Sequence, residues 1–170
     1  MRDSRRIEFI RKAVNEHQHS LTRYAAGMLR DIHAARDAVQ ETFLRLCSAD
    51  LIKIRPYLNQ WLFKVCRSRV MDIVKREKKM KNIDPGEIGK QSTSCPVAER
   101  NEPDTTIMKI IKELPPAQQE VIRLKFQEGL KYREISRITD KTVSNVGFLI
   151  HAALKTIRSR VRQFPQGGAE

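Results

Sequence analysis

The stretch from Tyr132 to Arg160 reads YREISRITDKTVSNVGFLIHAALKTIRSR, and apolar residues recur in it every three or four positions. A polar break at Thr139-Asp140-Lys141 divides it into two runs. Because this spacing is typical of amphipathic helices, we predict a short helix, a tight turn and a longer helix. The inward stripe of the longer helix is expected at Val143, Val146, Ile150, Leu154, Ile157 and Val161.

Such a helix pair fits two roles. In a helix-turn-helix, the second helix places its exposed N-terminal half in the DNA major groove. An ordinary helical hairpin that closes a core has the same periodicity, so the pair alone does not decide between the roles. In the DNA-binding role Thr142 caps the second helix, whose outward residues meet base edges: Ser144, Asn145, Gly147, Phe148 and His151. The residues expected to bind phosphates are Lys125, Lys131, Arg133, Lys141 and Lys155.

The charge of the whole chain favours a polyanionic partner. Among its 170 residues, 33 lysines and arginines oppose 20 acidic residues, a formal net charge of +13. A solvated basic surface is the alternative reading. No apolar run approaches the roughly 20 residues that span a bilayer, and the N-terminal MRDSRRIEF lacks the apolar core of a secretion signal. We therefore expect a cytoplasmic protein with no membrane insertion.

Metal, cofactor or catalytic chemistry is not indicated. The cysteines, Cys47, Cys66 and Cys95, form no Cys-x-x-Cys pair, and the histidines lack ligand spacing. We expect Cys47 and Cys66 to be small core residues. Clustered carboxylates, a glycine-rich phosphate loop and a nucleophile with its base are also absent from the sequence. We expect no enzyme activity, no metal, no cofactor and no small-molecule substrate.

Helical periodicity extends over nearly the whole chain, which predicts an all-α protein. The composition changes in one segment, NIDPGEIGKQSTSCPVAERNEPDT, which has two basic and five acidic residues and several prolines and glycines. We expect a flexible acidic linker there, between two small helical domains. The predicted order is a first domain over residues 1–81, the linker over 82–105, a second domain over 106–164 and a disordered tail over 165–170.

Three helical runs are predicted in the first domain. The first extends roughly from Arg5 to Leu29, Asp31 is the expected N-cap of the second, and Pro56 the expected start of the third. The expected inward residues of the second run are Ala35, Val39, Thr42, Phe43 and Leu46. The expected apolar stripe of the third run is Leu58, Trp61, Leu62, Val65, Val70, Ile73 and Val74.

Prolines and a glycine delimit the helices at the start of the second domain. Pro115 and Pro116 are expected to end one helix and begin the next. That next helix is expected to continue to Phe126, and Gly129 to supply a left-handed residue after its end.

Three motifs together resemble a bacterial sigma factor of the extracytoplasmic-function (ECF) group of the sigma-70 family. RDAVQETFLRL (Arg36–Leu46) resembles the segment that binds core RNA polymerase. PYLNQWLFKVCRSRVMDIVKREKK (Pro56–Lys79) resembles the segment that opens and reads the −10 promoter element. ELPPAQQEVIRLKFQEGLKYREISRI (Glu113–Ile138), with the helices after it, resembles the domain that reads the −35 element. The three occur in the order of the family, on both sides of the linker.

The resemblance implies a transcription initiation factor whose partners are core RNA polymerase, through its β′ clamp helices and β flap, promoter DNA and an anti-sigma factor. The implied polymerase-binding residues are Asp37, Gln40, Glu41, Phe43 and Arg45. The implied −10 residues are Lys53, Arg55, Lys64, Arg67, Ser68, Arg69, Lys75 and Arg76, with a base-capturing loop at Lys53, Ile54 and Arg55. Trp61 matches the tryptophan of the family, and we expect it to lie in the core.

The chain departs from the family pattern at four places, one of which is a loop before Pro56 that is shorter than usual. Ser68 stands where an asparagine is common, and Asp140-Lys141 replaces a turn that usually bears glycine. The predicted recognition helix has no arginine that could pair with guanine before Lys155. We therefore expect −35 readout through DNA shape, phosphates and apolar contact.

A helix-turn-helix regulator that binds a palindrome as a homodimer is the alternative function. Such a regulator needs a dimer surface, and the sequence offers no heptad run that would build one.

Overall fold

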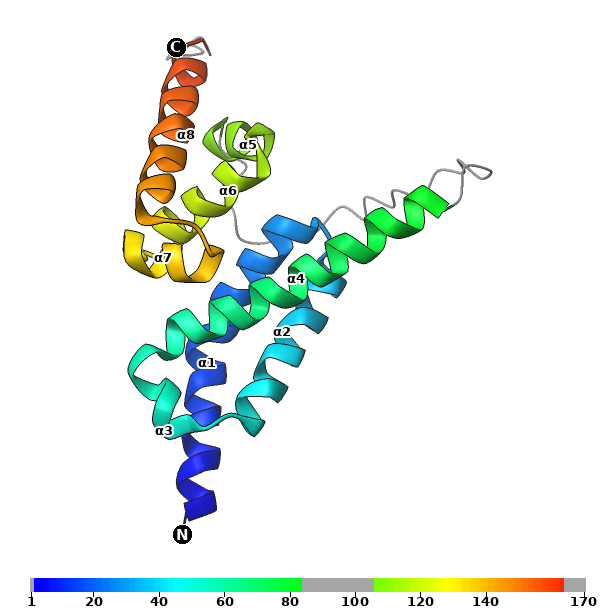
Figure 1. The fold of residues 1–170 in the computed structure, drawn as a ribbon, viewed down its shortest axis with the longest axis vertical. Coiled ribbons are helices and arrows are strands. Elements are labelled where there is room, and N and C mark those ends of the chain that lie inside the picture. The colour runs from blue at the N-terminus through cyan, green and yellow to red at the C-terminus, as the bar shows by residue number, and fades with distance from the viewer. Residues whose placement is uncertain (1, 84–105, 164–170) are drawn as a thin grey trace, which may run out of the picture. The chain divides into compact units, whose positions relative to one another are not determined.

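The computed structural model describes residues 2–83 and 106–163, all of them in helices or short connections, so the all-α prediction is confirmed. The described residues form two compact units (Figure 1). The first contains α1 (Arg2–Leu29), α2 (Ile32–Ser48), α3 (Leu51–Ile54), the 3₁₀ turn η1 (Arg55–Tyr57) and α4 (Leu58–Ile83). The second contains α5 (Thr106–Glu113), α6 (Pro116–Ile122), the π-helical turn η2 (Arg123–Gln127), most of α7 (Tyr132–Thr139) and α8 (Val143–Gln163).

The predicted linker and tail lie almost entirely outside the described residues. Of the linker only Asn82 and Ile83 are described, and they form the last residues of α4. The first predicted domain boundary therefore falls inside the final turn of that helix.

Three long helices, α1, α2 and α4, form the first unit by packing against one another. The fully buried side chains at their centre include Leu21, Leu46 and Leu62. The rings of Tyr24 and Phe63 meet edge to face, with centroids 5.4 Å apart and planes at 79°, an arrangement that adds to the stabilisation from buried apolar area. The C-terminal part of α4 extends past α1 and α2 (Figure 1), and residues 75–80 are all exposed.

Both ends of α2 are closed by side chains. The Asp31 carboxylate accepts hydrogen bonds from the backbone N–H groups of His33 and Ala34, at 2.8 and 3.2 Å, so the predicted N-cap is confirmed. At the other end, one nitrogen of the Arg6 guanidinium donates to the carbonyls of Cys47 and Ala49, at 2.6 and 3.0 Å. Arg6 thus satisfies carbonyl groups that a helix end leaves without partners.

The inward stripe predicted for α2 is confirmed at all five positions, although Phe43 keeps 9% of its surface exposed. The stripe of α4 is confirmed only in part. Leu62 and Val70 are buried, but the core contribution of this helix also includes Phe63 and Cys66, while Trp61 and Val65 are half-buried.

Two predictions about the first unit are wrong. Whereas Cys66 is buried as predicted, Cys47 is exposed, because Leu46 takes the inward position and the next residue points about 100° further around the helix. The expected loop at Lys53, Ile54 and Arg55 is helical instead. Asp50 caps α3 through the N–H of Ile52 at 3.2 Å, and Ile54 is 6% exposed, so its side chain lies in the core.

The core of the second unit forms where α8 packs on α6 and α5. The α5 helix ends at Glu113, just before the two prolines, and Pro116 begins α6 as predicted. The Gln119 side-chain amide donates to the carbonyls of Lys112 and Leu114, at 3.0 and 2.6 Å, and so closes the end of α5. The α6 helix ends at Ile122 and continues as η2, so the predicted single α-helix to Phe126 is wrong in its last turn.

The inward stripe predicted for α8 is right only in its middle. Val146 and Ile150 are buried, and the core also takes in Ala153. Val143 and Val161 are exposed by 43% and 42%, so both ends of the predicted stripe are wrong. The reason is length, since α5 and α6 have 8 and 7 residues and cannot cover a helix of 21.

Left-handed residues set the turns on either side of α7. Gly129 has φ +67°, as predicted for the residue that follows the α6 and η2 segment. Asp140 has φ 55° and so takes the conformation that glycine usually supplies in this turn. The hydroxyl of Thr142 accepts from the N–H of Asn145 at 3.1 Å, which confirms Thr142 as the N-cap of α8. Within the described ranges, no helix combines the length and apolar character needed to cross a membrane.

Candidate functional site

The outer face of α2 carries four of the five residues predicted to bind polymerase. Asp37, Gln40 and Arg45 are exposed and Glu41 is half-buried. Phe43 lies in the core, so it supports this face from within. Leu44 was not among the predicted residues, yet 68% of it is exposed. The sequence could have indicated this exposure, because Leu44 lies off the predicted buried stripe of the helix. Leu44 adds an apolar group to an otherwise polar face.

Glu41 joins α2 to α4. One carboxylate oxygen forms an ion pair with the Arg69 Nε at 2.6 Å, and the other accepts a hydrogen bond from an Arg45 guanidinium nitrogen at 3.1 Å. The Glu41 and Arg69 side chains are 32% and 26% exposed. A residue predicted to bind polymerase is therefore paired with a residue predicted to bind DNA.

The two basic residues before α4 are held by local contacts. The Lys53 Nζ lies 3.5 Å from a carboxylate oxygen of Asp50, which also caps α3. The Arg55 guanidinium lies over the Phe9 ring of α1, 5.5 Å from its centroid, a cation–π arrangement that restricts a long side chain. Both residues remain exposed.

The predicted DNA-binding residues of α4 differ in exposure. Lys64, Ser68, Lys75 and Arg76 are exposed, and Arg67 and Arg69 are half-buried. The exposed residues extend along the helix to its projecting end, where Lys78 and Lys79 add charge that the prediction did not include. This basic face is suited to tracking a nucleic-acid backbone.

The N-terminal half of α8 presents the predicted base-reading residues. Ser144, Asn145, Phe148 and His151 are exposed, and 69% of the Phe148 surface is accessible. Lys131, Arg133 and Lys155 are exposed, whereas Lys125 and Lys141 are half-buried. An exposed aromatic beside small polar groups fits the apolar and shape readout expected of this helix.

Tyr132 contacts two residues of the same surface and was not among the residues predicted from the sequence. The Lys125 Nζ lies over its ring, 5.4 Å from the centroid, and also donates to the Leu130 carbonyl at 3.4 Å. A Cβ on Gly147 would lie 3.6 Å from the ring. Tyr132 therefore lies between two predicted contact residues, Lys125 and Gly147.

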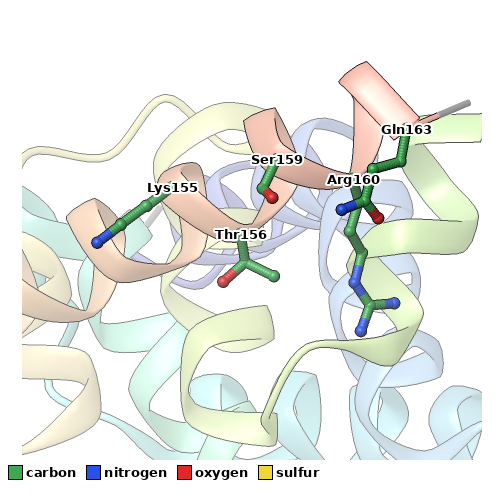
Figure 2. Close-up of a pocket in the computed structure, with 5 residues that line it drawn as sticks. All are labelled: Lys155, Thr156, Ser159, Arg160 and Gln163. Carbon is green, nitrogen blue, oxygen red and sulfur yellow. The ribbon is translucent and has the colours of Figure 1, made fainter.

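The C-terminal half of α8 is also strongly basic. A shallow depression there is lined by Lys155, Thr156, Ser159, Arg160 and Gln163 (Figure 2). Arg160 forms an ion pair with Glu113 of α5. A neighbouring depression includes Arg158 and Arg162, which the prediction did not contain although the run IRSRVR signals them. The basic surface of this helix thus extends beyond the predicted residues.

Comparison with known families identifies both units. A model described as sigma-70 region 2 matches residues 13–80, and one described as sigma-70, region 4 matches residues 105–157. The chain belongs to the sigma-70 family. The two matches cover more than two thirds of this sigma factor and occur in the order that its motifs predict.

Curated relatives place the sigma factor in the ECF group. It is 28% identical over 149 residues to the ECF RNA polymerase sigma factor SigM of Bacillus subtilis (strain 168), covering 84% of this chain and 89% of the relative. It is 27% identical over 146 residues to the RNA polymerase sigma factor SigV of the same strain, covering 85% of this chain and 86% of the relative.

A solved structure has the same fold. The sigma factor RpoE from Bartonella quintana, crystallised in complex with the anti-sigma factor NepR, matches with a TM-score of 0.67 and 18% identity. The match covers 89% of this chain and 96% of that one.

Proposed function

We propose that this sigma factor binds core RNA polymerase and directs it to specific promoters as a transcription initiation factor. The observation that carries the proposal is the order of the two family matches, region 2 followed by region 4, across both helical units. The role is non-catalytic, and we place it in the cytoplasm with the polymerase.

The exposed face of α2 is the proposed polymerase contact. Asp37 and Gln40 offer a carboxylate and an amide to solvent, and Leu44 adds exposed apolar surface beside them. A helix of the β′ clamp with basic or amide side chains and an apolar stripe would complement this face. The second unit would supply a separate contact with the polymerase at the β flap.

The basic face of α4 is the proposed −10 contact. Lys64, Ser68, Lys75 and Arg76 are exposed along it. Strand opening leaves unstacked bases that must be held, and a row of cations can bind the phosphates between them. Lys53 in α3 and Arg55 in η1 contact Asp50 and Phe9, precede this helix in the chain and extend this surface.

The N-terminal half of α8 is the proposed −35 contact. Its exposed residues enter the major groove, and Lys131 and Arg133 on α7 and its cap bind phosphates. Two modest DNA contacts become a selective one when the polymerase fixes their separation, because the second then forms at high effective concentration.

An anti-sigma factor is the proposed regulatory partner. The support is the fold shared with RpoE of Bartonella quintana, which is a sigma factor seen with such a partner. The exposed polymerase-binding and DNA-binding faces are the surfaces that an inhibitor would have to cover.

Transcription from defined start sites tests the proposal. Purified chain and core RNA polymerase are incubated with a library of genomic fragments, and the 5′ ends of the transcripts are mapped. The expected result is a set of promoters that share two spaced elements and are silent with core polymerase alone. If the chain alone binds a palindromic duplex tightly and core polymerase adds nothing, the proposal is wrong.

A further inference from the structure

The Glu41 carboxylate lies between two guanidinium groups that come from different helices. Arg45 reaches one of its oxygens from the next turn of α2, and Arg69 reaches the other from α4. The contact with Arg69 is the shorter of the two, at 2.6 Å between the Nε and the oxygen. The attraction between opposite charges increases as their separation falls, so the shorter ion pair is the closer electrostatic partner of Glu41.

Each member of the Glu41–Arg69 pair belongs to a surface with a different partner. Glu41 follows Asp37 and Gln40 on the proposed polymerase face, and Arg69 lies among the proposed −10 contacts. Both side chains keep a fraction of their surface exposed, 32% for Glu41 and 26% for Arg69. An incoming group can therefore reach either one, and half-exposed pairs exchange partners at low cost compared with fully buried ones.

We propose that the Glu41–Arg69 pair couples polymerase binding to DNA binding. In the free sigma factor, Glu41 holds Arg69 and reduces its capacity to bind a phosphate. A cationic or amide group of the polymerase that bonds to Glu41 weakens that hold, and Arg69 becomes available to the −10 strand. The inference rests on the proposed function, since it requires that the α2 face contacts polymerase and that α4 contacts DNA.

The coupling is a competition, and competition is reciprocal. If polymerase binding to Glu41 releases Arg69, then removing Arg69 must make Glu41 more available to polymerase. If the pair only holds α2 against α4, a different result is expected. Breaking it would then lower the stability of the first unit and leave the affinities for polymerase and for DNA unchanged or reduced. The two affinities of the free chain therefore distinguish coupling from this structural role.

The first measurement is the affinity of the free, full-length chain for a fluorescent single-stranded oligonucleotide of mixed sequence, by anisotropy at low salt. Glu41→Ala should bind about fivefold or more tightly than the parent, and Glu41→Ala/Arg69→Ala should lose that gain. Glu8→Ala is the matched control, because it removes the same charge from an exposed site on α1. Equal gains for Glu41→Ala and Glu8→Ala, or a gain that survives without Arg69, would overturn the proposal.

The second measurement is the affinity for core polymerase in the absence of DNA. Arg69→Ala should tighten it, whereas Arg11→Ala, which removes an exposed charge from α1, should not. Unchanged or weaker binding by Arg69→Ala overturns the coupling, and it is the result expected of a pair that only holds α2 against α4. Circular dichroism confirms that each variant is folded.

The two proposals fail in different ways. If the parent chain does not bind core polymerase, the proposed function fails. If it binds and Arg69→Ala brings no gain, only the coupling fails.

Discussion

The ring of Tyr132 lies 3.6 Å from the point that a Cβ atom of Gly147 would occupy. This is ordinary van der Waals distance, so an added methyl group would fit against the ring. Tyr132 thus lies beside α8 at Gly147, on the surface proposed to read the −35 element.

Gly147→Ala should stabilise the second unit. Alanine favours the interior of a helix over glycine by about 0.8–1.0 kcal/mol, and the new methyl group meets no close contact. Urea unfolding followed by circular dichroism measures the gain. Gly129→Ala is the matched control, because Gly129 has φ +67° and open space around it. That variant should lose stability, and a loss in both would mean that the Tyr132 contact is tighter than the structure shows.

Asp31→Ala should destabilise the first unit. The carboxylate caps α2 through two backbone N–H groups, and removal of such a cap costs about 1 kcal/mol. Trp61, the only tryptophan of the chain, lies in this unit and reports its unfolding in urea by fluorescence. Asp50→Ala removes the cap of a helix of only four residues and should cost less. Equal losses would contradict the importance assigned to the α2 cap.

The stability of the first unit should fall as the pH rises above 9. Burial raises the pKa of the Cys66 thiol from 9.0 to about 12, although a hydrogen bond with Thr42 acts in the opposite direction. Between these values the unfolded chain has lost the proton that the folded chain retains, so a rise in pH favours unfolding.

The slope that Cys66 adds is at most about 1.4 kcal/mol per pH unit. Cys66→Ala removes it, so the stability difference between parent and variant should narrow from pH 9 to pH 11. Other groups also titrate in this range, but their contribution to stability is common to parent and variant and cancels in the difference. A difference that stays constant with pH would show that the thiol ionises in the folded state as readily as in the unfolded one.

Arg133→Ala and Asn145→Ala should weaken −35 binding in different ways. Arg133 is an exposed cation on α7, so its loss should weaken binding to every duplex and lower the slope of log K against log salt by about 0.9. Asn145 is uncharged and exposed on α8, so its loss should alter sequence preference and leave the slope unchanged. Measurements use polymerase holoenzyme on promoter duplexes at several salt concentrations. Identical slopes for the two variants would contradict the division between phosphate and base contacts.

Local features of the helices could be predicted from the sequence because each depends on neighbours along the chain. Asp31, Pro116 and Gly129 are examples, since an N-cap, a first-turn proline and a left-handed residue follow from residue chemistry alone. The family motifs likewise identified both units before their structure was known.

Features that depend on how the helices meet could not be predicted in this way. The exposed ends of α8 follow from the shortness of α5 and α6, which periodicity within α8 does not show. The Glu41–Arg69 bond joins residues 28 positions apart and depends on the crossing of α2 and α4. The sequence did contain a local sign of the helix through Lys53, because Asp50 is a cap residue that directly precedes Leu51.

Arg6 reaches the carbonyl groups of Cys47 and Ala49. The order of the last turn of α2, just beyond Arg45, therefore depends on a side chain contributed 41 residues earlier. Removing the N-terminal residues up to and including Arg6, or fusing a bulky tag next to Arg6, would fray the C-terminal end of α2, the helix proposed to dock on polymerase. An engineered version of this sigma factor is consequently safer with its affinity tag placed elsewhere.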